Sequence, residues 1–333
     1  MAEGSMMGTW KEDVAAAAGM IPDAAALKGR RVLVAGATGL IGRAFTAVLE
    51  QAGAEAVRTT RSRGAKDVYF DAMDAEGVPD VRAGYIVNLA GNADPASIAA
   101  DPAGTLLMSV NGTRRLLEAA RRCGARFLYV SSSEIYGRPV GKGPWRENDR
   151  GLVEPLSPRA SYAAGKRAAE ALCAGSFAGY GADVVIARPG HVYGPTAPQR
   201  DSHVAAQLLR SAARGEDLVL KSAGTQMRSW VHCLDCAAAL ATLLTRGKAG
   251  EAYNVAHPQG AMSIRGFAHA VARAAGVRLL FDDATAAEKR AFNPMDDLRL
   301  NADKLVSLGW QGLYGVEDGV AECLGVMRQG GPD

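Results

Sequence analysis

A tyrosine and a lysine stand four positions apart in the segment 161–170 (SYAAGKRAAE), which reads as a helix. Because residues four apart share one face of a helix, Tyr162 and Lys166 are expected to lie side by side. A lysine ammonium next to a phenol favours the phenolate and lowers the phenol's pKa. The pair therefore predicts proton transfer at a substrate hydroxyl, and it is expected to contact a bound cofactor as well.

A serine-rich segment, 131–137 (SSSEIYG), follows a short apolar run at 126–130 that reads as a strand. A hydroxyl at this point can bond the substrate oxygen that loses its proton, and Glu134 adds a carboxylate that can act as a base. The alternatives are a plain serine-rich turn and a solvated glutamate in a loop.

The segment 36–42 (GATGLIG) has three glycines spaced GxxGxxG between an expected strand, 31–35, and an expected helix, 41–51. Gly36 allows a tight turn, Gly39 lets the backbone approach a pyrophosphate, and Gly42 allows the helix to pack closely on the strand. The helix N-terminus supplies N–H donors to phosphate. The loop therefore predicts dinucleotide binding, through the residues Gly36, Thr38, Gly39, Leu40, Ile41 and Gly42.

The end of the second expected strand, 54–60, indicates which dinucleotide binds. NAD-specific proteins place an acidic residue there, which accepts hydrogen bonds from the ribose and repels a 2′-phosphate. Counting eighteen positions from Gly42 reaches Thr60, and no acid occurs between Ala56 and Lys66. Arginines occur instead, at 58, 61 and 63, and a guanidinium beside a hydroxyl suits a 2′-phosphate. We therefore favour NADP over NAD, with Thr60 and Arg61 as contacts; the alternative is solvated arginines and bound NAD.

Two further segments are expected to contact the cofactor. Asp71 follows the third expected strand and can accept a hydrogen bond from an adenine amino group, with Ala72 beside it; the alternative is a helix N-cap. Small residues close the fourth strand, where they would let the cofactor cross the strand ends: Leu89, Ala90 and Gly91.

Strands alternate with helices from residue 31 to residue 187, which predicts an α/β fold with a doubly wound parallel Rossmann sheet. We expect a dinucleotide-binding core at 29–194, to which 227–257 returns. A smaller C-terminal substrate-binding lobe is expected at 195–226 and 258–333. Residues 1–28 are expected to form an N-terminal extension that is helical and packs on the core.

The bulk properties exclude several classes. The 333 residues carry a formal net charge of +3 with 22% charged residues, which is too mild for a nucleic-acid or membrane-surface protein. No apolar run is long enough to span a membrane and no basic leader precedes the chain, so a cytoplasmic location is expected by default. The five cysteines include a CxxC, Cys233 and Cys236, interpreted as buried thiols beside a helix start, with zinc or redox chemistry as the alternative. No metal site is expected.

The motifs GATGLIG, SSSEIYG, YAAGK, RPGHVYGP and the closing LGW resemble those of the extended short-chain dehydrogenase family, the nucleotide-sugar epimerases, dehydratases and decarboxylases. The resemblance runs from about residue 30 to about residue 319. It implies that Tyr162 takes a proton from the sugar 4-hydroxyl while a hydride passes to the nicotinamide, with Ser132 and Lys166 in support. The resulting 4-keto intermediate permits epimerisation, loss of water or loss of a carboxylate.

The resemblance also implies roles for individual residues. Ser133-Glu134 is similar to the pair in decarboxylases and GDP-mannose dehydratases, and Glu134 argues for chemistry beyond oxidation at C4. Further cofactor contacts are implied at Asn111 and Pro189. Implied contacts with a nucleoside-diphosphate sugar are Asn92, Ser132, His191, Arg228 and Arg299. A homodimer is implied through helices at 105–123 and 161–178. The rival readings are an NADPH-dependent nucleotide-sugar 4-ketoreductase and a dinucleotide-binding sensor without enzymatic activity.

Overall fold

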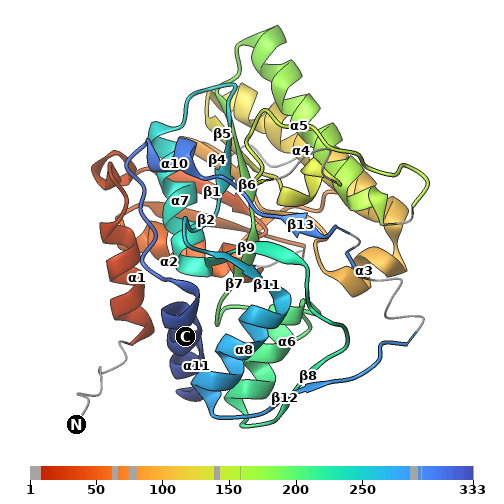
Figure 1. Ribbon diagram of the computed structural model, residues 1–333. Coiled ribbons are helices and arrows are strands. Elements are labelled where there is room, and N and C mark those ends of the chain that lie inside the picture. The colour runs from red at the N-terminus through yellow and green to blue at the C-terminus, as the bar shows by residue number, and fades with distance from the viewer. Residues whose placement is uncertain are drawn as a thin grey trace.

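The computed structural model describes residues 9–61, 67–74, 81–138, 143–157, 159–285, 292–293 and 295–332. Its main sheet has seven strands, all parallel, in the order β10-β6-β5-β4-β1-β2-β3 (Figure 1). The bounds of these strands are Arg31–Ala35 (β1), Glu55–Thr60 (β2), Val68–Tyr69 (β3), Tyr85–Asn88 (β4), Arg126–Val130 (β5), Val184–Pro189 (β6) and Ala252–Val255 (β10). The predicted doubly wound parallel sheet is confirmed.

The central strand β1 shows why the sheet needs helices on both faces. Successive side chains of a strand point to opposite faces. Val32 and Val34 belong to one buried cluster and Leu33 and Ala35 to another, and all four are fully buried. A strand that is apolar on both faces is typical of a parallel sheet covered on both sides.

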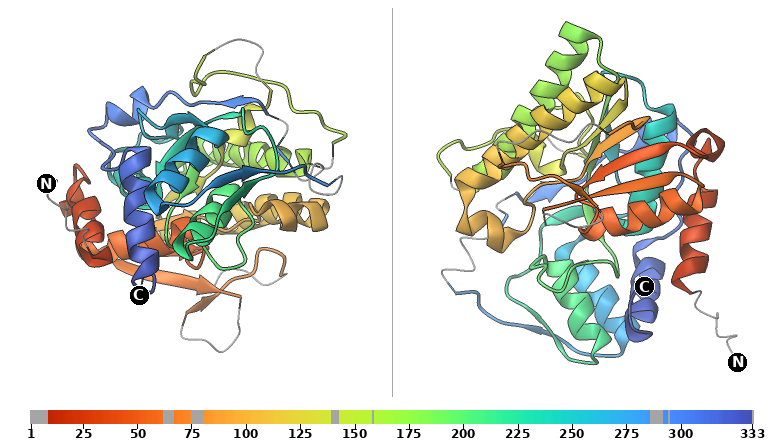
Figure 2. Two further views of the ribbon diagram at one scale, coloured as in Figure 1. Left: turned by 60° about the horizontal axis from the view of Figure 1, so that its bottom comes forward. Right: turned by 180° about the vertical axis from the view of Figure 1, so that it is seen from behind.

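Helices cover both faces of this sheet, as the two views of Figure 2 show. The first cluster includes side chains of α2 (Leu40–Gln51) and α7 (Cys233–Arg246), and α1 (Trp10–Gly19) packs on both of these helices. The second cluster includes α4 (Pro102–Cys123) and α5 (Ala160–Tyr180), which lie along each other. The short helix α3 (Pro95–Ala100) leads into α4.

The N-terminal extension is helical over a shorter range than expected. Thr9 and Glu12 form a capping box that starts α1, and the helix ends at Gly19. A 3₁₀ turn, η1 (Ala24–Leu27), follows before β1. The Tyr314 hydroxyl donates to a carboxylate oxygen of Asp13 at 2.7 Å, which ties α1 to the chain near its C-terminus.

A second, smaller hydrophobic core lies below the main sheet in Figure 1. Its centre is a stack of the Trp230 and Phe267 rings, whose centroids are 4.0 Å apart. The elements around it are α6 (Val204–Ala213), β8 (Leu218–Leu220), α8 (Ile264–Ala275), β12 (Leu279–Phe281) and α11 (Val316–Arg328). A four-stranded sheet joins this lobe to the core, and it contains β7 (His191–Tyr193), β9 (Met227–His232), β11 (Ala261–Ser263) and β13 (Asp297–Leu298).

Part of the segment assigned to the lobe lies with the core instead. Leu305, in α10 (Asp303–Val306), and Trp310 are fully buried in the cluster that contains α2 and α7. The Trp310 indole donates to the carbonyl oxygen of Asp235 in α7 at 3.2 Å, so a hydrogen bond fixes this return. No helix in the described part of the chain is both long and apolar enough to cross a membrane.

Candidate active site

The phosphate loop places two of its glycines, Gly36 and Gly42, where no side chain fits. Gly36 begins the turn after β1 with a φ of +87°, and a Cβ there would lie 2.6 Å from the carbonyl carbon of Leu89. A Cβ on Gly42 would lie 2.2 Å from the carbonyl oxygen of Gly36. Gly39 is the N-cap residue of α2, so the helix begins beside the loop. The backbone N–H groups at this helix start suit a pyrophosphate.

The end of β4 lies next to this loop and next to α5, the helix that carries Tyr162 and Lys166. Asn88 accepts a hydrogen bond from the Ala90 N–H at 3.1 Å and donates to the Thr113 hydroxyl at 3.1 Å. A Cβ on Gly91 would lie 3.6 Å from Nζ of Lys166. The backbone of the predicted small residues, 89–91, therefore contacts both the phosphate loop and Lys166. The hydrogen bonds of Asn88 hold this segment in place.

Asp71 lies in a turn that packs on α4. Its carboxylate accepts from the Met73 N–H at 2.9 Å, and its carbonyl oxygen accepts from Arg115 at 2.7 Å. A Cβ on Gly112 would lie 3.0 Å from Cβ of Ala72, so the turn and the helix are in close contact. No helix starts at Asp71, so the N-cap alternative is wrong; the adenine contact stays a prediction, as does the role of the half-buried Asn111 in α4.

Basic side chains surround the place where β2 ends. Thr60 is the last residue of β2, and Arg61 after it is exposed, whereas Ser62 and Arg63 lie outside the described residues. Arg58 already pairs with Glu50 at 2.9 Å. Arg43, which the sequence reasoning missed, is exposed and donates to the carbonyl oxygen of Thr38 in the phosphate loop at 3.3 Å. The position of Arg43 directly after Gly42, the last glycine of the motif, could have pointed to this residue.

The predicted catalytic pair, Tyr162 and Lys166, lies on α5, with both side chains buried. Nζ of Lys166 is 5.9 Å from the Tyr162 ring centroid and donates to the carbonyl oxygen of Val130 at 2.8 Å. Burial lowers the pKa of Lys166 to about 8, against the opposing effect of Glu170. The predicted juxtaposition of a phenol and an amine is therefore present, and the end of β5 fixes the amine.

The predicted lowering of the tyrosine pKa by the lysine is wrong for this state of the protein. Burial, together with the nearby Glu134 charge, raises the pKa of Tyr162 to about 12. A hydrogen bond with Ser132 and the charge of Arg159 act in the opposite direction. The sequence could not show this balance because burial of the phenol is a property of the tertiary structure.

Ser132 and Glu134 lie at the start of a 3₁₀ turn, η2 (Ser133–Tyr136), directly after β5. The Ser132 hydroxyl accepts from the Glu134 N–H at 3.2 Å as the N-cap of this turn, and Ser133 is buried. An oxygen of the Glu134 carboxylate lies 2.9 Å from Nη2 of Arg159, and the two side chains are only 12–13% exposed. Glu134 is therefore a buried, ion-paired carboxylate, and its reading as a solvated loop residue is wrong.

Two predicted substrate contacts lie near one another in the strands that join core and lobe. His191 in β7 is the register partner of Trp230 in β9 and meets its ring edge-on. Arg228, also in β9, is 1% exposed, and burial lowers its pKa to about 10 against the opposing charge of Glu134. Burial also lowers the pKa of His191, and the charge of Arg228 lowers it further. Pro189 ends β6, immediately before this region.

Two other predicted contacts are already engaged. Arg299 forms an ion pair with Asp297 in which the shortest distance is 2.6 Å, and its side chain is 33% exposed. The Asp297 charge also opposes the lowering of the Arg228 pKa. The Asn92 amide donates to the Thr105 hydroxyl at 2.8 Å. Arg299 is therefore already ion-paired with Asp297, whereas Arg228 has no ion pair among the described residues.

A hydrogen-bonded tie between core and lobe was not predicted from the sequence. Asp94 caps α3 and accepts from both the backbone N–H and the hydroxyl of Ser202, at 2.7 and 2.6 Å. The adjacent His203 contacts Asp201 at 2.7 Å. Burial lowers the pKa of His203, but Asp201 and the charges of Asp94 and Glu134 outweigh it, so the pKa is raised. The contact between Asp94 and Ser202 could not be predicted from the sequence, because about one hundred positions separate the two residues.

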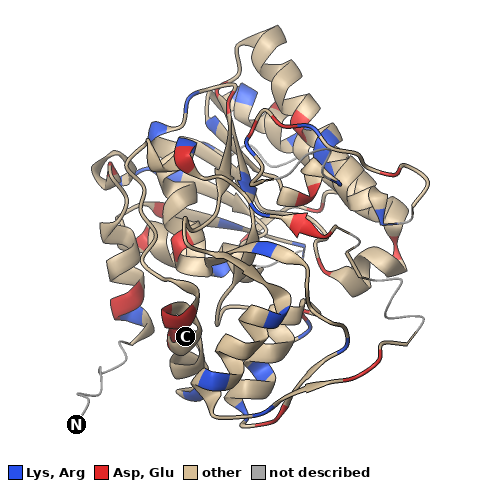
Figure 3. Cartoon of the chain, in the orientation of Figure 1, with Lys and Arg blue, Asp and Glu red and all other residues tan. Residues whose placement is uncertain are grey.

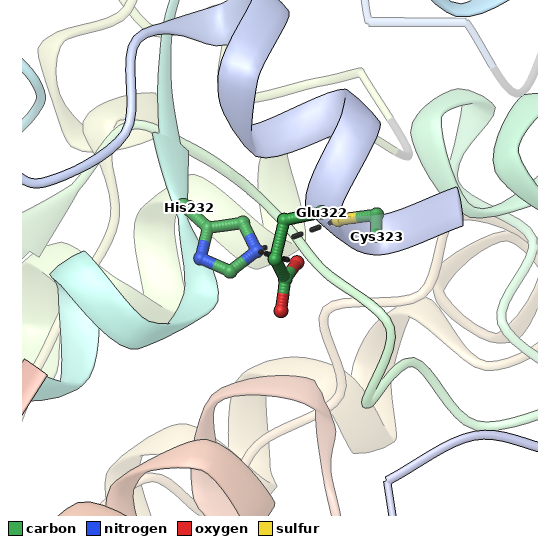
Figure 4. Close-up of side chains that lie close together, drawn as sticks. All are labelled: His232, Glu322 and Cys323. Atoms are coloured by element: carbon green, nitrogen blue, oxygen red, sulfur yellow. Dashed lines mark hydrogen bonds and ion pairs between the residues drawn. The ribbon is translucent and has the colours of Figure 1, made fainter. Parts of the chain in front are cut away.

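A second buried cluster joins β9 to α11, as Figure 4 shows. Nε2 of His232 lies 2.9 Å from the carboxylate of Glu322 and 3.4 Å from Sγ of Cys323. Nδ1 of the same ring accepts from the Leu234 N–H at 3.4 Å, which leaves the proton on Nε2. A metal-bound histidine instead donates from its second nitrogen. The cluster is therefore described as a brace between β9 and α11. Both thiols of the CxxC are fully buried at the start of α7, as predicted.

The arrangement defines a dinucleotide-binding enzyme fold with a Ser–Tyr–Lys centre at the carboxyl end of the sheet. Basic and acidic residues are interspersed along its elements in the view of Figure 3, with no one-signed basic stripe in that view. Residues 32–256 match the NAD dependent epimerase/dehydratase family, and the chain belongs to that family.

Relatives and solved structures agree with this assignment. UDP-glucuronic acid decarboxylase 1 of Xenopus tropicalis is 29% identical over 311 residues, which cover 90% of this chain and 72% of that protein. Plant UDP-glucuronic acid decarboxylases also match, but the chain spans about half of their length or less.

The solved structure of a UDP-glucose 4-epimerase of Thermus thermophilus with NAD is 26% identical, with a TM-score of 0.75, and the match covers 89% of this chain and 98% of that one. The structure of RMD of Pseudomonas aeruginosa with NADPH is also 26% identical, with a TM-score of 0.73, and the match covers 90% of this chain and 99% of that one. The predicted class, an NAD(P)-dependent enzyme of nucleotide sugars, is confirmed at the level of the family.

Proposed function

We propose that the chain is an NAD(P)-dependent decarboxylase of a nucleoside-diphosphate uronic acid. The observation that carries the proposal is the buried Glu134 carboxylate, paired with Arg159 beside Tyr162. Plain epimerisation at C4 needs oxidation, rotation and reduction, and it has no use for such a group. The names of the relatives from Xenopus and from plants support loss of a carboxylate over loss of water.

The residues around the phosphate loop fit the cofactor. Side chains at Gly36 and Gly42 would collide with the backbone, so the loop keeps the open form that a pyrophosphate needs. The bound nicotinamide dinucleotide supplies a hydride acceptor and donor. Lys166, held by the Val130 carbonyl, is positioned to bind and orient the ribose next to it.

The chain's own residues perform the proton transfers. Tyr162 takes the proton of the sugar 4-hydroxyl as that carbon is oxidised, and the hydrogen bond with Ser132 favours the phenolate. The 4-keto sugar is then a β-keto acid. Its C5–carboxylate bond breaks, carbon dioxide leaves, and the electron pair enters the enolate of the C4 ketone. Glu134 orients the leaving carboxylate or handles the proton at C5.

We propose NADP as the preferred cofactor, with Arg61 and Thr60 contacting the 2′-phosphate and Arg43 beside the phosphate loop. Arg58 is engaged by Glu50, which leaves Arg61 as the exposed guanidinium at the end of β2. The test compares dissociation constants for NAD and NADP in the parent and in Arg61→Ala, with Arg31→Ala as a control at the other end of the sheet. Tighter binding of NAD in the parent, unchanged in Arg61→Ala, would overturn the preference.

We propose a cytoplasmic homodimer with a substrate-binding lobe at 195–226 and in most of 258–333. The pairing surface would be the helices at 105–123 and 161–178, which already lie along each other in one chain. Leu107 on this surface is 45% exposed. Light scattering is expected to give twice the chain mass, and Leu107→Glu is expected to lower it. A monomeric parent protein at working concentration contradicts the proposal.

The deciding experiment offers the protein UDP-, dTDP-, GDP- and CDP-sugars, including uronic acids, and reads products by mass spectrometry. Loss of carbon dioxide from a uronic acid is the expected result, and it should disappear in Tyr162→Phe. Loss of water or an unchanged mass with an altered sugar would replace the decarboxylase with a dehydratase or an epimerase. Stoichiometric cofactor consumption would favour the ketoreductase.

A further inference from the structure

Arg159 is the residue directly before α5, and its guanidinium is only partly used inside the chain. Nη2 lies 2.9 Å from Glu134, and the arginine side chain is 13% exposed. Its other two nitrogens, Nε and Nη1, are buried and have no hydrogen-bond partner among the described residues. An arginine has five N–H donors in a rigid plane, so most of its hydrogen-bonding capacity is left unsatisfied.

A second buried arginine shows what a fully used guanidinium looks like in this fold. Arg188 in β6 donates from Nε and Nη2 to both oxygens of Glu170, at 3.0 and 2.6 Å. Its Nη1 donates to the hydroxyl of Tyr136 at 3.0 Å and to the carbonyl of Glu147 at 2.8 Å. Leaving charged donors without partners is costly in a buried place. The contrast indicates that Arg159 is arranged for an acceptor that the chain does not contain.

The position of Arg159 points to the chemistry of that acceptor. Its guanidinium carbon lies 5.9 Å from the centroid of the Tyr162 ring, and its charge acts on both Tyr162 and His191. Tyr162 acts at the sugar 4-hydroxyl in the proposed reaction, so the substituents on the adjacent C3 and C5 are the nearest parts of the sugar. In a uronic acid the one on C5 is a carboxylate, the only anion of the two. Arg159 is ion-paired with Glu134 through Nη2 alone, so its remaining positively charged N–H groups suit an anionic acceptor.

We infer that Arg159 is a specificity-determining residue whose unpartnered N–H groups bind the C5 carboxylate of a uronic-acid substrate. The inference rests on the proposed function, because it assigns the substrate class of that same site. Arg159 holds the carboxylate beside Glu134 and selects uronic acids over neutral hexoses. When the carboxylate leaves as carbon dioxide, these hydrogen bonds are lost, so the product binds more weakly than the substrate.

The test uses a charged and a neutral ligand with the same nucleotide. Dissociation constants for UDP-glucuronate and UDP-glucose are measured in the parent, in Arg159→Met and in Arg159→Lys, each with cofactor bound. Arg159→Met is expected to weaken UDP-glucuronate on the order of 10- to 100-fold and to leave UDP-glucose within about twofold. Arg159→Lys, which keeps the charge but not the planar donors, is expected to restore part of the loss.

Arg126→Met is the matched control, because Arg126 pairs with Asp183 and two carbonyl groups far along the sheet. It is expected to lower stability without changing the ratio of the two constants. Equal weakening of both ligands in Arg159→Met, or none, overturns the inference, and thermal unfolding checks that each variant is folded. If the parent binds UDP-glucuronate through Arg159 but releases no carbon dioxide, the decarboxylase proposal fails and the binding role stands.

Discussion

Nζ of Lys166 donates a hydrogen bond to the carbonyl oxygen of Val130 at 2.8 Å. Val130 is the last residue of β5, and the serines of the catalytic turn follow it directly. One hydrogen bond thus fixes the distance between the helix that carries Tyr162 and the turn that carries Ser132. Burial of the amine lowers the pKa of Lys166 to about 8.

Lys166→Met is expected to reduce turnover on the order of 100-fold or more and to weaken cofactor binding, because the variant removes the proposed ribose contact and the hydrogen bond to Val130. The cofactor dissociation constant and kcat are the two measurements. A variant with near-normal values for both would remove Lys166 from its assigned role.

The same residue predicts a pH dependence of stability in the protein without cofactor. The pKa of Lys166 is about 8 when folded and 10.5 by its ordinary value, so the unfolded chain holds the extra proton between these limits. The free energy of unfolding therefore gains a contribution that rises with pH across this window, by at most about 1.4 kcal/mol per pH unit. Denaturant unfolding at several pH values should show this slope in the parent and lose it in Lys166→Met.

Ser132→Ala is expected to raise the pKa of Tyr162 still further, because the hydrogen bond with the serine is one of the interactions that lower it. Turnover at neutral pH should fall on the order of 100-fold, and the rising limb of the kcat profile should move to higher pH. A fall in kcat without a shift in the profile would indicate that Ser132 acts only by positioning the substrate.

Glu134→Gln is expected to separate oxidation from the later chemistry. The amide keeps the size of the side chain and loses its charge, so bound cofactor should still be reduced on mixing with substrate while little product forms. Stopped-flow absorbance and product analysis are the measurements, with the exposed Glu154→Gln as the control. Normal product formation by Glu134→Gln would favour a simple epimerase.

The sequence predicted the features that depend on local backbone geometry. The glycine spacing at Gly36 and Gly42 and the four-residue spacing of Tyr162 and Lys166 each specify one turn or one helix face, so the structure places them as expected. The same holds for the parallel sheet, because strands with two apolar faces require helices on both sides.

The features that the sequence missed depend on contacts between distant segments. Glu134 and Arg159 are twenty-five positions apart, and nothing in either residue type predicts that they form a pair. The raised pKa of Tyr162 follows from burial, which the spacing of residues does not encode. Trp310 packs on α7 rather than in the lobe, and its indole donates a hydrogen bond to the carbonyl oxygen of Asp235. A hydrogen bond to a backbone carbonyl of a distant segment cannot be predicted from the sequence.

We propose that the enzyme oxidises its substrate at C4 and that the hydride returns to the sugar after the carboxylate has left. The most direct test counts cofactor against product with UDP-glucuronate as substrate. We predict that reduced cofactor appears transiently and that many molecules of decarboxylated product form for each molecule of cofactor. Consumption of one cofactor per product, or product formation at an undiminished rate by Tyr162→Phe, would contradict the account.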